Sequence, residues 1–427
     1  MIYVHIPFCK SFCTYCGFYS ETSDCYDSYV EALMAEINSR KPEFGATRGV
    51  NTLYIGGGTP SVMPLPLFSR VVGTLKDACG ASAFEEFTVE LNPEDVVRRG
   101  EAYAEALLGM GVTRASMGVQ SFDDGILRWM NRRHDAGTAV TAYRILERAG
   151  FRNISIDLIF GLPELRADLL PMYSKDTRYE KVACGADYFP LLNESLWRET
   201  IHRALDISTS GARPTHISAY QLSVEPDSAL EQMIGDGRCR EASEELCARQ
   251  YEILCEELAE AGYHHYEISN FAQPGREAVH NSAYWRHVPY VGLGPGAHSL
   301  SVLPDGHLCR SWNTPDLKMY LENFEPQGKM RTEDVSLHAC GSEILTSEQL
   351  GIENVMLGLR TSRGCSLSQL CDACDKARLD AAISSGHIVP VLDDSALLGR
   401  KNIVQPYYRI PERYFFISDN IISELLG

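Results

Sequence analysis

The sequence predicts an α/β protein built around a parallel sheet. Short apolar segments that suit strands alternate with amphipathic segments that suit helices, and this alternation is typical of parallel sheets with crossover helices. Polar or glycine-rich motifs follow most of the predicted strands. In a β/α barrel the carboxyl ends of the strands surround the active site. We therefore expect one functional site at that edge, assembled from loops that lie far apart in the sequence.

The composition excludes several classes of protein. The chain has 427 residues, enough for two or three domains, and its hydrophobic content of 44% is ordinary for a globular protein. A formal net charge of −18 argues against a nucleic-acid partner, which requires a basic surface. No apolar run reaches the ~18 residues of a membrane span, so membrane contact is at most peripheral. Fourteen cysteines without a signal peptide predict the cytoplasm.

The strands and helices are assigned from apolar periodicity and turn signals. Strands are predicted at residues 2–6, 51–55, 86–91, 114–119, 153–160 and 216–222. Helices are predicted at residues 24–39, from 64 onward, at 101–110, in two stretches within 123–149, and at 194–207 and 241–261. Asp24 is the expected cap of the first helix.

The most informative motif is a cysteine triad that follows the first strand. Cys9, Cys13 and Cys16 have the spacing C-x3-C-x2-C, and three thiolates on one loop can bind three irons of a [4Fe–4S] cluster. The fourth iron would then be open to a small molecule. A structural zinc site is the alternative, although it normally takes four ligands from spaced pairs. Thiols of a disulfide framework are a third interpretation, but nothing in the sequence indicates secretion.

With Tyr-Val-His-Ile-Pro-Phe directly before Cys9, the triad resembles the signature of the radical S-adenosylmethionine (SAM) enzymes. More narrowly, it resembles the family of the oxygen-independent coproporphyrinogen III dehydrogenase HemN and the heme chaperone HemW. The resemblance implies that the fourth iron binds SAM and that an electron entering the cluster cleaves SAM to methionine and a 5′-deoxyadenosyl radical. It also implies a partial barrel of six strands, a radical SAM (β/α)6 barrel.

The same resemblance implies a set of SAM contacts, most of them near strand ends. They are Tyr3, Tyr15, Gly57, Gly58, Thr59, Glu90, Gln120, Arg132 and Asp157. The residue types suit the role, because carboxylates can bind ribose hydroxyls or an ammonium group and Arg132 can fork onto the SAM carboxylate. The structural alternatives are that the carboxylates are turn or cap residues and that the glycines only form a tight turn. Arg133 competes with Arg132 for the role.

Local features distinguish the two relatives. The decarboxylating dehydrogenases carry a fourth cysteine where this chain has Phe18, and they carry an N-terminal extension before the first strand, where this sequence starts. The string from His280 to Trp285 resembles the His-Asn-x-x-Tyr-Trp motif of HemW, in which the histidine is linked to heme binding. His280 is thus a candidate heme ligand, with Tyr284 and Trp285 covering the porphyrin and His298 as the second choice. The alternative is a structural histidine beside a core tryptophan.

The resemblance also organises the chain into domains. A barrel with the cluster loop spans 1–235, with an insertion at about 164–192 that the family lacks; an extension with the His280 motif spans 236–332. A small α+β, winged-helix-like domain spans 333–427, with a helix at 343–359, a hairpin at 388–409 and a helix at 417–426. Cys365, Cys371 and Cys374 in this domain are expected to be free thiols rather than a metal site.

The function that these observations predict is binding and delivery: an iron–sulfur protein that binds SAM and heme and passes heme to a client protein. The first alternative is a coproporphyrinogen III dehydrogenase acting on a porphyrinogen, and the second is a radical SAM enzyme that modifies heme. The electron donor would be a flavodoxin or a ferredoxin. No residue is assigned a catalytic role from the sequence.

Overall fold

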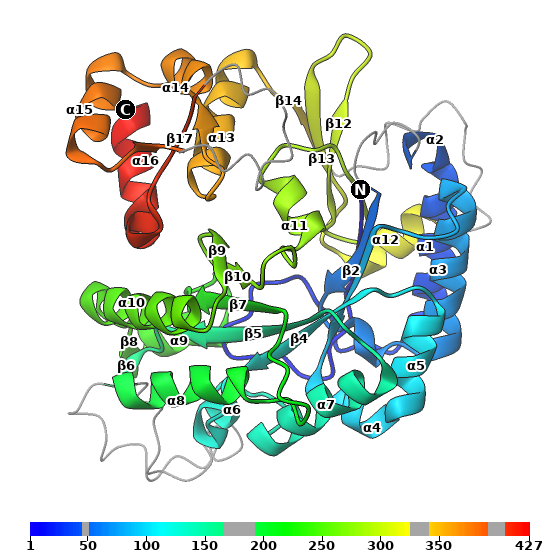
Figure 1. The fold of residues 1–427 in the computed structure, drawn as a ribbon. Helices are drawn as coiled ribbons and strands as arrows, with labels where there is room; N and C mark the ends of the chain where they lie inside the picture. The colour runs from blue at the N-terminus through cyan, green and yellow to red at the C-terminus, as the bar shows by residue number, and fades with distance from the viewer. Residues whose placement is uncertain (45–50, 166–192, 325–340, 392–405) are drawn as a thin grey trace.

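The computed structural model describes residues 1–44, 51–165, 193–324, 341–391 and 406–427 (Figure 1). Within these residues the largest sheet has nine strands. In spatial order they are β11 (Val291–Leu293), β1 (Ile2–Ile6), β2 (Thr52–Gly57), β3 (Glu86–Leu91), β4 (Arg114–Gln120), β5 (Ile154–Phe160), β7 (His216–Gln221), β10 (Asn270–Ala272) and β9 (His264–Glu267). Each of the six predicted strands is present within two residues of its expected bounds.

The six strands from β1 to β7 pair in chain order, and every one of these pairings is parallel. At one edge β11 continues the sheet in parallel with β1, and at the other edge the hairpin of β10 and β9 continues it antiparallel to β7. The two edge strands do not pair with each other within the described residues. The predicted partial barrel of six β/α units is therefore confirmed, and it is open along one side.

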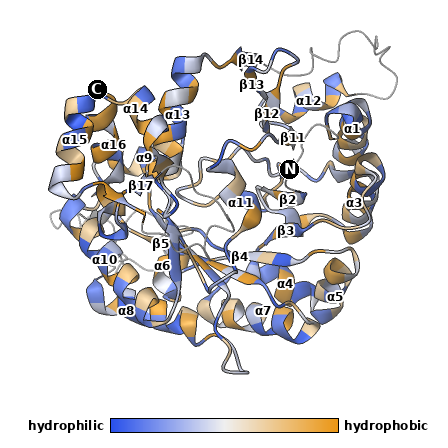
Figure 2. Ribbon diagram, turned by 45° about the horizontal axis from the view of Figure 1, so that its top comes forward, coloured by the Kyte–Doolittle hydropathy of each residue, from blue (hydrophilic) through white to orange (hydrophobic). Residues whose placement is uncertain are grey.

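Helices cover the outer face of the sheet (Figure 1). They are α1 (Tyr26–Ser39), α2 (Lys41–Phe44), α3 (Leu65–Cys79), α4 (Pro93–Arg99), α5 (Glu101–Gly109), α6 (Asp124–Trp129), α7 (Ala136–Ala149), α8 (Glu194–Leu205), α9 (Ala229–Gly235) and α10 (Glu244–Glu260). They are banded with hydrophilic and hydrophobic residues (Figure 2), as expected for helices with one buried face. In α7, for example, Asp135 caps the amino terminus, Ala139, Ala142 and Leu146 are buried, and Gly150 ends the helix at a φ of 114°.

The expectation that Asp24 caps the first helix is wrong. The helix begins at Tyr26, and the capping position is Cys25, whose side chain makes no capping hydrogen bond. The Ser23 hydroxyl instead lies 3.3 Å from the Cys25 backbone nitrogen, one residue before the helix. Asp and Ser are both common before helices, so the sequence pattern does not distinguish a cap from a turn two residues upstream.

The region after the barrel contains short elements that the sequence pattern did not reveal. They are α11 (Val279–Tyr284), β12 (His298–Val302), β13 (Leu308–Trp312) and α12 (Leu317–Asn323). Within the barrel, between β5 and β7, lies β6 (Glu164–Leu165), which pairs with β8 (Cys239–Arg240). The two residues of β6 begin the predicted insertion, whose remaining residues, 166–192, lie outside the described part of the chain.

The carboxyl-terminal region is a small α+β unit, as predicted. Its helices are α13 (Ser347–Leu359), α14 (Leu367–Ala373), α15 (Lys376–Ser385) and α16 (Ser418–Leu426), and its antiparallel sheet comprises β15 (Cys365–Ser366), β17 (Tyr407–Arg409) and β16 (Val389–Pro390). The expected helix at 343–359 starts late, because residues 341–344 form β14 (Gly341–Ile344) and pair with β13, where Glu343 meets Arg310 at 2.7 Å. No helix within the described ranges is long and apolar enough to cross a membrane.

A buried carboxylate connects the first helix with the region after the barrel. Glu36 of α1 is completely buried, and its Oε2 accepts hydrogen bonds from the Gly294 backbone nitrogen at 2.8 Å and the Tyr320 hydroxyl at 2.7 Å. Its Oε1 accepts one from Asn313 at 2.8 Å and lies 3.4 Å from Arg40. One side chain thus connects α1 to the segment after β11 and to α12.

We expect Glu36→Ala to lower the free energy of unfolding by about 3 kcal/mol, because it leaves several buried donors and Arg40 without their acceptor. The control is Glu31→Ala, which removes a roughly half-exposed ion pair with Arg70 and should cost less than about 1 kcal/mol. Urea unfolding of both variants measures the difference. Equal shifts in the two variants would show that Glu36 does not join these segments.

Candidate functional site

A cavity of about 530 Å³ lies at the carboxyl ends of the parallel strands. The loop after β1 lines it, and so do residues at or just after the ends of β2, β3, β4, β5 and β7. All three cysteines of the triad contribute, as do eight of the nine predicted SAM contacts: Tyr15, Gly57, Gly58, Thr59, Glu90, Gln120, Arg132 and Asp157. The chain thus brings these side chains together although the sequence separates them widely, as the strand-end argument predicts.

The cysteine loop, residues 9–20, is attached to its surroundings at several points. The Cys9 amide donates to the Glu21 carbonyl at 2.9 Å, which closes the base of the loop. The Thr14 hydroxyl donates to the Trp129 carbonyl at 2.7 Å, and the Asn131 amide donates to the Phe12 carbonyl at 2.7 Å. These bonds connect the loop to the residues at the end of α6 and after it, so its path does not depend on a bound group alone.

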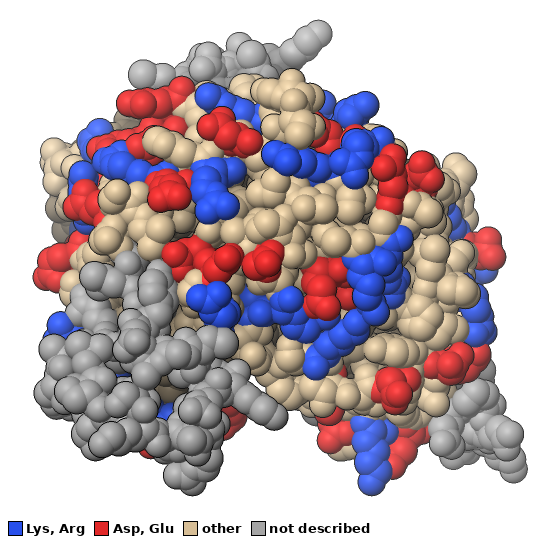
Figure 3. Space-filling view, turned by 90° about the horizontal axis from the view of Figure 1, so that it is seen from below, with Lys and Arg blue, Asp and Glu red and all other residues tan. Residues whose placement is uncertain are grey.

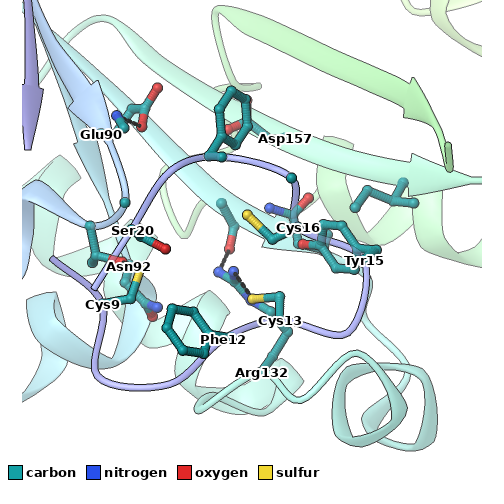
Figure 4. Close-up of a pocket in the computed structure, with 18 of the residues that line it drawn as sticks. Cys9, Phe12, Cys13, Tyr15, Cys16, Ser20, Glu90, Asn92, Arg132 and Asp157 are labelled. Atoms are coloured by element: carbon teal, nitrogen blue, oxygen red, sulfur yellow. Dashed lines mark hydrogen bonds between the residues drawn. The ribbon is translucent and has the colours of Figure 1, made fainter. Parts of the chain in front are cut away.

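The three thiols face the same cavity, as Figure 4 shows for Cys9, Cys13 and Cys16. None of the three forms a disulfide. Burial raises the pKa of the Cys16 thiol to about 11, and the nearby Cys13 and Cys9 also raise it. A thiol held in this way is deprotonated far more readily when a metal binds it. The described residues contain no group of three His, Cys, Asp or Glu side chains placed to hold a single metal ion.

Glycines bring the chain close to the cysteine loop. Gly57, at the end of β2, has a φ of 110°, a conformation that side chains other than glycine rarely adopt. A Cβ atom on Gly58 would lie 2.8 Å from the Phe8 carbonyl oxygen and 3.1 Å from the Cys9 sulfur. The Thr59 hydroxyl lies 3.4 Å from the same sulfur. The glycines are therefore required for close approach to the loop, beyond the needs of an ordinary turn.

Two partly buried carboxylates line the cavity, Glu90 from β3 and Asp157 from β5, the strands on either side of β4. Glu90 accepts from the Tyr54 hydroxyl at 2.6 Å and from the Gly57 amide at 3.1 Å, and burial raises its pKa to about 7. Burial likewise raises the pKa of Asp157 to about 6. Such shifts are typical of functional carboxylates in clefts. Neither residue is a helix cap or turn residue, so the structural alternative does not account for them.

Unsatisfied polar atoms also mark the cavity. Gln120 has a φ of 68° beside a register shift between β4 and β5, and its buried Oε1 has no hydrogen-bond partner. Arg132 donates to the Gly118 carbonyl at 2.7 Å and approaches the Cys13 sulfur at 3.4 Å, while its Nε atom has no partner. Backbone strain and orphaned polar groups at one place indicate a ligand site.

The choice between the two neighbouring arginines follows from their contacts. Arg133 is paired with Glu94 at 2.7 Å and with Asp95 at 3.1 Å. Burial opposes the charge of Arg132, but Tyr15 and the Cys13 and Cys9 thiols raise its pKa above the ordinary value. Arg132 therefore faces the cysteine loop without a carboxylate partner within the described residues, whereas Arg133 pairs with two carboxylates of α4.

The heme candidates and Tyr3 lie elsewhere. Tyr3 does not line the first cavity; with His280 and Tyr284 it lines a second cavity of about 480 Å³. The His280 ring is almost fully buried and both of its nitrogens are engaged, Nδ1 with the Thr52 hydroxyl at 2.7 Å and Nε2 with the Tyr284 hydroxyl at 2.9 Å. Trp285 lines neither cavity. The motif thus places two of its three side chains at one site, and its histidine is not free in this conformation.

Sequence reasoning missed several residues that complete the site. Tyr54 holds Glu90, Ser116 lies 3.4 Å from Asp157, and Asn131 anchors the cysteine loop. Tyr54 and Ser116 could have been found by stepping four residues back, from Gly58 along β2 and from Gln120 along β4, because alternate strand residues share a face. No local signal identifies Asn131, whose role depends on the fold around the loop.

Comparisons with known proteins agree with this geometry. Residues 3–174 match the radical SAM superfamily model. The chain is 30% identical to the Heme chaperone HemW of Synechocystis over 90% of this chain and 84% of the relative, and 30% identical to that of Bacillus subtilis over 87% and 86%. The coproporphyrinogen III oxidase HemN of Escherichia coli, described as a radical SAM enzyme, has the same fold, with a TM-score of 0.71 at 22% identity over 100% of this chain and 89% of that one. The superfamily implies a [4Fe–4S] cluster and SAM.

We expect Cys13→Ser to lose most of the iron and sulfide that the reconstituted wild type retains, since a serine hydroxyl is a poor cluster ligand. Cys371→Ser is the matched control, because Cys371 is an exposed free thiol. Iron and sulfide analysis and electron paramagnetic resonance report on both variants. A full [4Fe–4S] spectrum from Cys13→Ser would contradict the assignment of the triad.

SAM affinity should rise with pH. Glu90 and Asp157 have raised pKa values of about 7 and about 6, so both lose their charge as the pH falls, and SAM hydroxyl or ammonium donors then lose ionised acceptors. We expect affinity to fall by up to about tenfold per pH unit below these values and to level off above about pH 8. Anaerobic calorimetry measures the profile.

Glu90→Gln should remove the change in SAM affinity near pH 7, which corresponds to the pKa of Glu90. The control is Glu85→Gln, which alters an exposed residue just before β3 and should leave the profile unchanged. A wild-type affinity that stays flat from about pH 5 to about pH 8 would show that neither carboxylate contacts the ligand.

Proposed function

Because the chain belongs to the HemW family of the radical SAM proteins, we propose that it binds a [4Fe–4S] cluster, SAM and heme, and passes the heme to a client protein. The observation that carries the heme part is a second cavity that adjoins the cysteine-loop cavity. The two share five lining residues: Gly17, Phe18, Tyr54, Ser116 and Tyr220. A ligand in the second cavity would therefore touch residues that also form the wall of the first.

Each residue of the first cavity has a role in this proposal. Cys9, Cys13 and Cys16 hold the cluster, and Arg132 balances the charge of the thiolates and receives the SAM carboxylate. Gly57, Gly58 and Thr59 allow close approach, while Glu90, Gln120 and Asp157 offer acceptors for hydroxyl or ammonium groups. Tyr15 and Tyr3 remain predicted contacts. When bound, the cluster and SAM supply one-electron chemistry; the chain positions them and limits access by water.

Phe18 favours heme handling over decarboxylation. Its side chain is 71% exposed and lines both cavities, although a large apolar group in water has an unfavourable hydration free energy. At the position where the dehydrogenases carry a fourth cysteine, this chain thus offers a flat apolar surface. Such a surface suits contact with a porphyrin face.

The remaining partners are proposed from charge and cysteine chemistry. On the face seen in Figure 3, Lys and Arg side chains are interspersed with Asp and Glu, which suits a protein partner better than nucleic acid. A small electron carrier, such as a flavodoxin or a ferredoxin, would reduce the cluster. The twelve free cysteines within the described residues suit a reducing compartment, as in the cytoplasm.

An anaerobic assay tests the function directly. The reconstituted protein is supplied with SAM, a strong reductant and coproporphyrinogen III, and in parallel with heme and an apoprotein acceptor. We expect no decarboxylated tetrapyrrole over many turnovers and a transfer of heme to the acceptor that is faster than from free heme. Formation of protoporphyrinogen over many turnovers would overturn the proposal and identify a dehydrogenase.

A further inference from the structure

The cysteine loop exposes a cation and an aromatic ring between its first two cysteines. Lys10 and Phe12 are both exposed, and 52% of Phe12 is accessible to water. Figure 4 shows the Phe12 ring beside Cys9 and Cys13. The Asn131 side chain donates to the Phe12 carbonyl at 2.7 Å, which fixes this part of the loop to the segment after α6. A partner that touches the ring therefore lies next to two of the three thiols.

Next to this ring, several cations share one buried carboxylate. Asp95 of α4 has no exposed surface, and three nitrogens lie close to its oxygens: Lys10 Nζ at 3.6 Å, Arg98 Nη2 at 2.9 Å and Arg133 Nη2 at 3.1 Å. Glu94 pairs with Arg133 at 2.7 Å. We call these five residues the Asp95 cluster. The side chains of Lys10 and Arg98 remain 35% and 49% exposed, so their charges face the solvent beside the cysteine loop.

The Asp95 cluster differs in charge from the chain as a whole. It holds three cations and two carboxylates, whereas the chain has a formal net charge of −18. Arg99 of the same helix adds a fourth cation, whose guanidinium donates to the carbonyls of Val62 and Met63. An acidic protein is repelled by the net charge of this chain and attracted by a local positive surface. Such a surface therefore selects where an acidic partner docks.

We propose that Lys10, Arg98 and Phe12 form the docking surface for a small acidic flavoprotein that reduces the cluster. This rests on the proposed function, which places a [4Fe–4S] cluster on the triad, and it assigns the place where the electron enters. Acidic side chains around the flavin would face Lys10 and Arg98, and the apolar edge of the flavin ring would pack on Phe12. One electron leaves the reduced flavin and enters the cluster, so the flavin is oxidised by one electron and the cluster is reduced by one.

Ionic strength tests the electrostatic part of the proposal without altering the protein. The full, reconstituted protein is mixed anaerobically with reduced flavodoxin, and the second-order rate constant of cluster reduction is followed by absorbance. Calorimetry measures the affinity of oxidised flavodoxin separately. We expect both the rate constant and the affinity to fall as salt is added, because salt screens the attraction. A rise with salt would show that the net charge governs the encounter, and would overturn the proposal.

The variants test the residues. The double variant Lys10→Gln, Arg98→Gln should reduce the rate constant at low salt by about tenfold and weaken its salt dependence, which a merely structural role would not do. Phe12→Ala should lower the rate constant and keep the salt dependence. The matched control is Arg148→Gln, which alters an exposed arginine at the carboxyl end of α7 that pairs with Glu101 and should behave as wild type.

An uncharged small reductant, photoreduced deazariboflavin, provides the control for the cluster itself. All variants should retain the iron and sulfide of wild type and react with this reductant at the wild-type rate. If a variant does not fold, the salt dependence of wild type still tests the proposal.

The outcomes separate the docking surface from the proposed function. A wild-type rate constant in the double variant at low salt, or an equal loss in Arg148→Gln, would overturn the docking surface. Faster reduction by an acidic ferredoxin than by flavodoxin would overturn the flavin as the electron source. If deazariboflavin reduces the cluster and flavodoxin does not, only the docking surface fails. If the triad retains no cluster, the proposed function fails as well.

Discussion

The parallel pairing of six strands in chain order is the constraint on which the other features depend. Because each strand returns through a helix, every strand ends at the same edge, and residues near the ends of all six strands line one cavity. The cysteine loop comes from the first of these ends, and Asp157 and Tyr220 come from the last two strands. A ligand placed there touches most of the barrel, although no single segment of sequence contains its site.

The same sheet does not close, and this has a structural cause. The hairpin of β10 and β9 extends the far edge antiparallel to β7, while β11 extends the near edge in parallel with β1. The lumen is thus reached from the side as well as from the strand ends. The lining of the second cavity includes strand starts, such as Arg114 and His216, as well as Tyr220 near the end of β7. The open barrel therefore has two cavities that share a wall.

Several polar residues of the first cavity adopt environments or backbone conformations that are unfavourable for the stability of the fold. Glu90 and Asp157 are ionisable groups withdrawn from water, with pKa values raised by burial, and Gln120 adopts a backbone conformation that is unfavourable for its side chain. Each of these features lowers stability. Their concentration beside the three thiols is best explained by a ligand that supplies the missing contacts. The usual preferences of residue types for exposure and backbone conformation are therefore broken at the site where function is expected.

The six strands could be predicted from the sequence because buried strands are dense apolar runs. The predicted bounds of all six lie within two residues of the observed ones. The first cavity could also be predicted, because in a parallel sheet the polar residues at the strand ends lie at one edge. Neither α11 nor the hydrogen bonding of the His280 ring nitrogens could be predicted from the sequence. The motif around His280 places an imidazole there, but it does not show which of its nitrogens is free. Only the fold shows that Thr52 at the start of β2 and Tyr284 one turn along α11 occupy both.

Glu86, at the start of β3, accepts hydrogen bonds from the amides of Val279 and His280. The His280 side chain and backbone therefore both fasten α11 to the base of the barrel, where α11 forms one wall of the second cavity. A substitution at His280 would then disturb the second cavity whether or not a ligand there contacts the imidazole. For this reason loss of binding alone cannot assign an axial ligand, whereas the spectrum of the iron can.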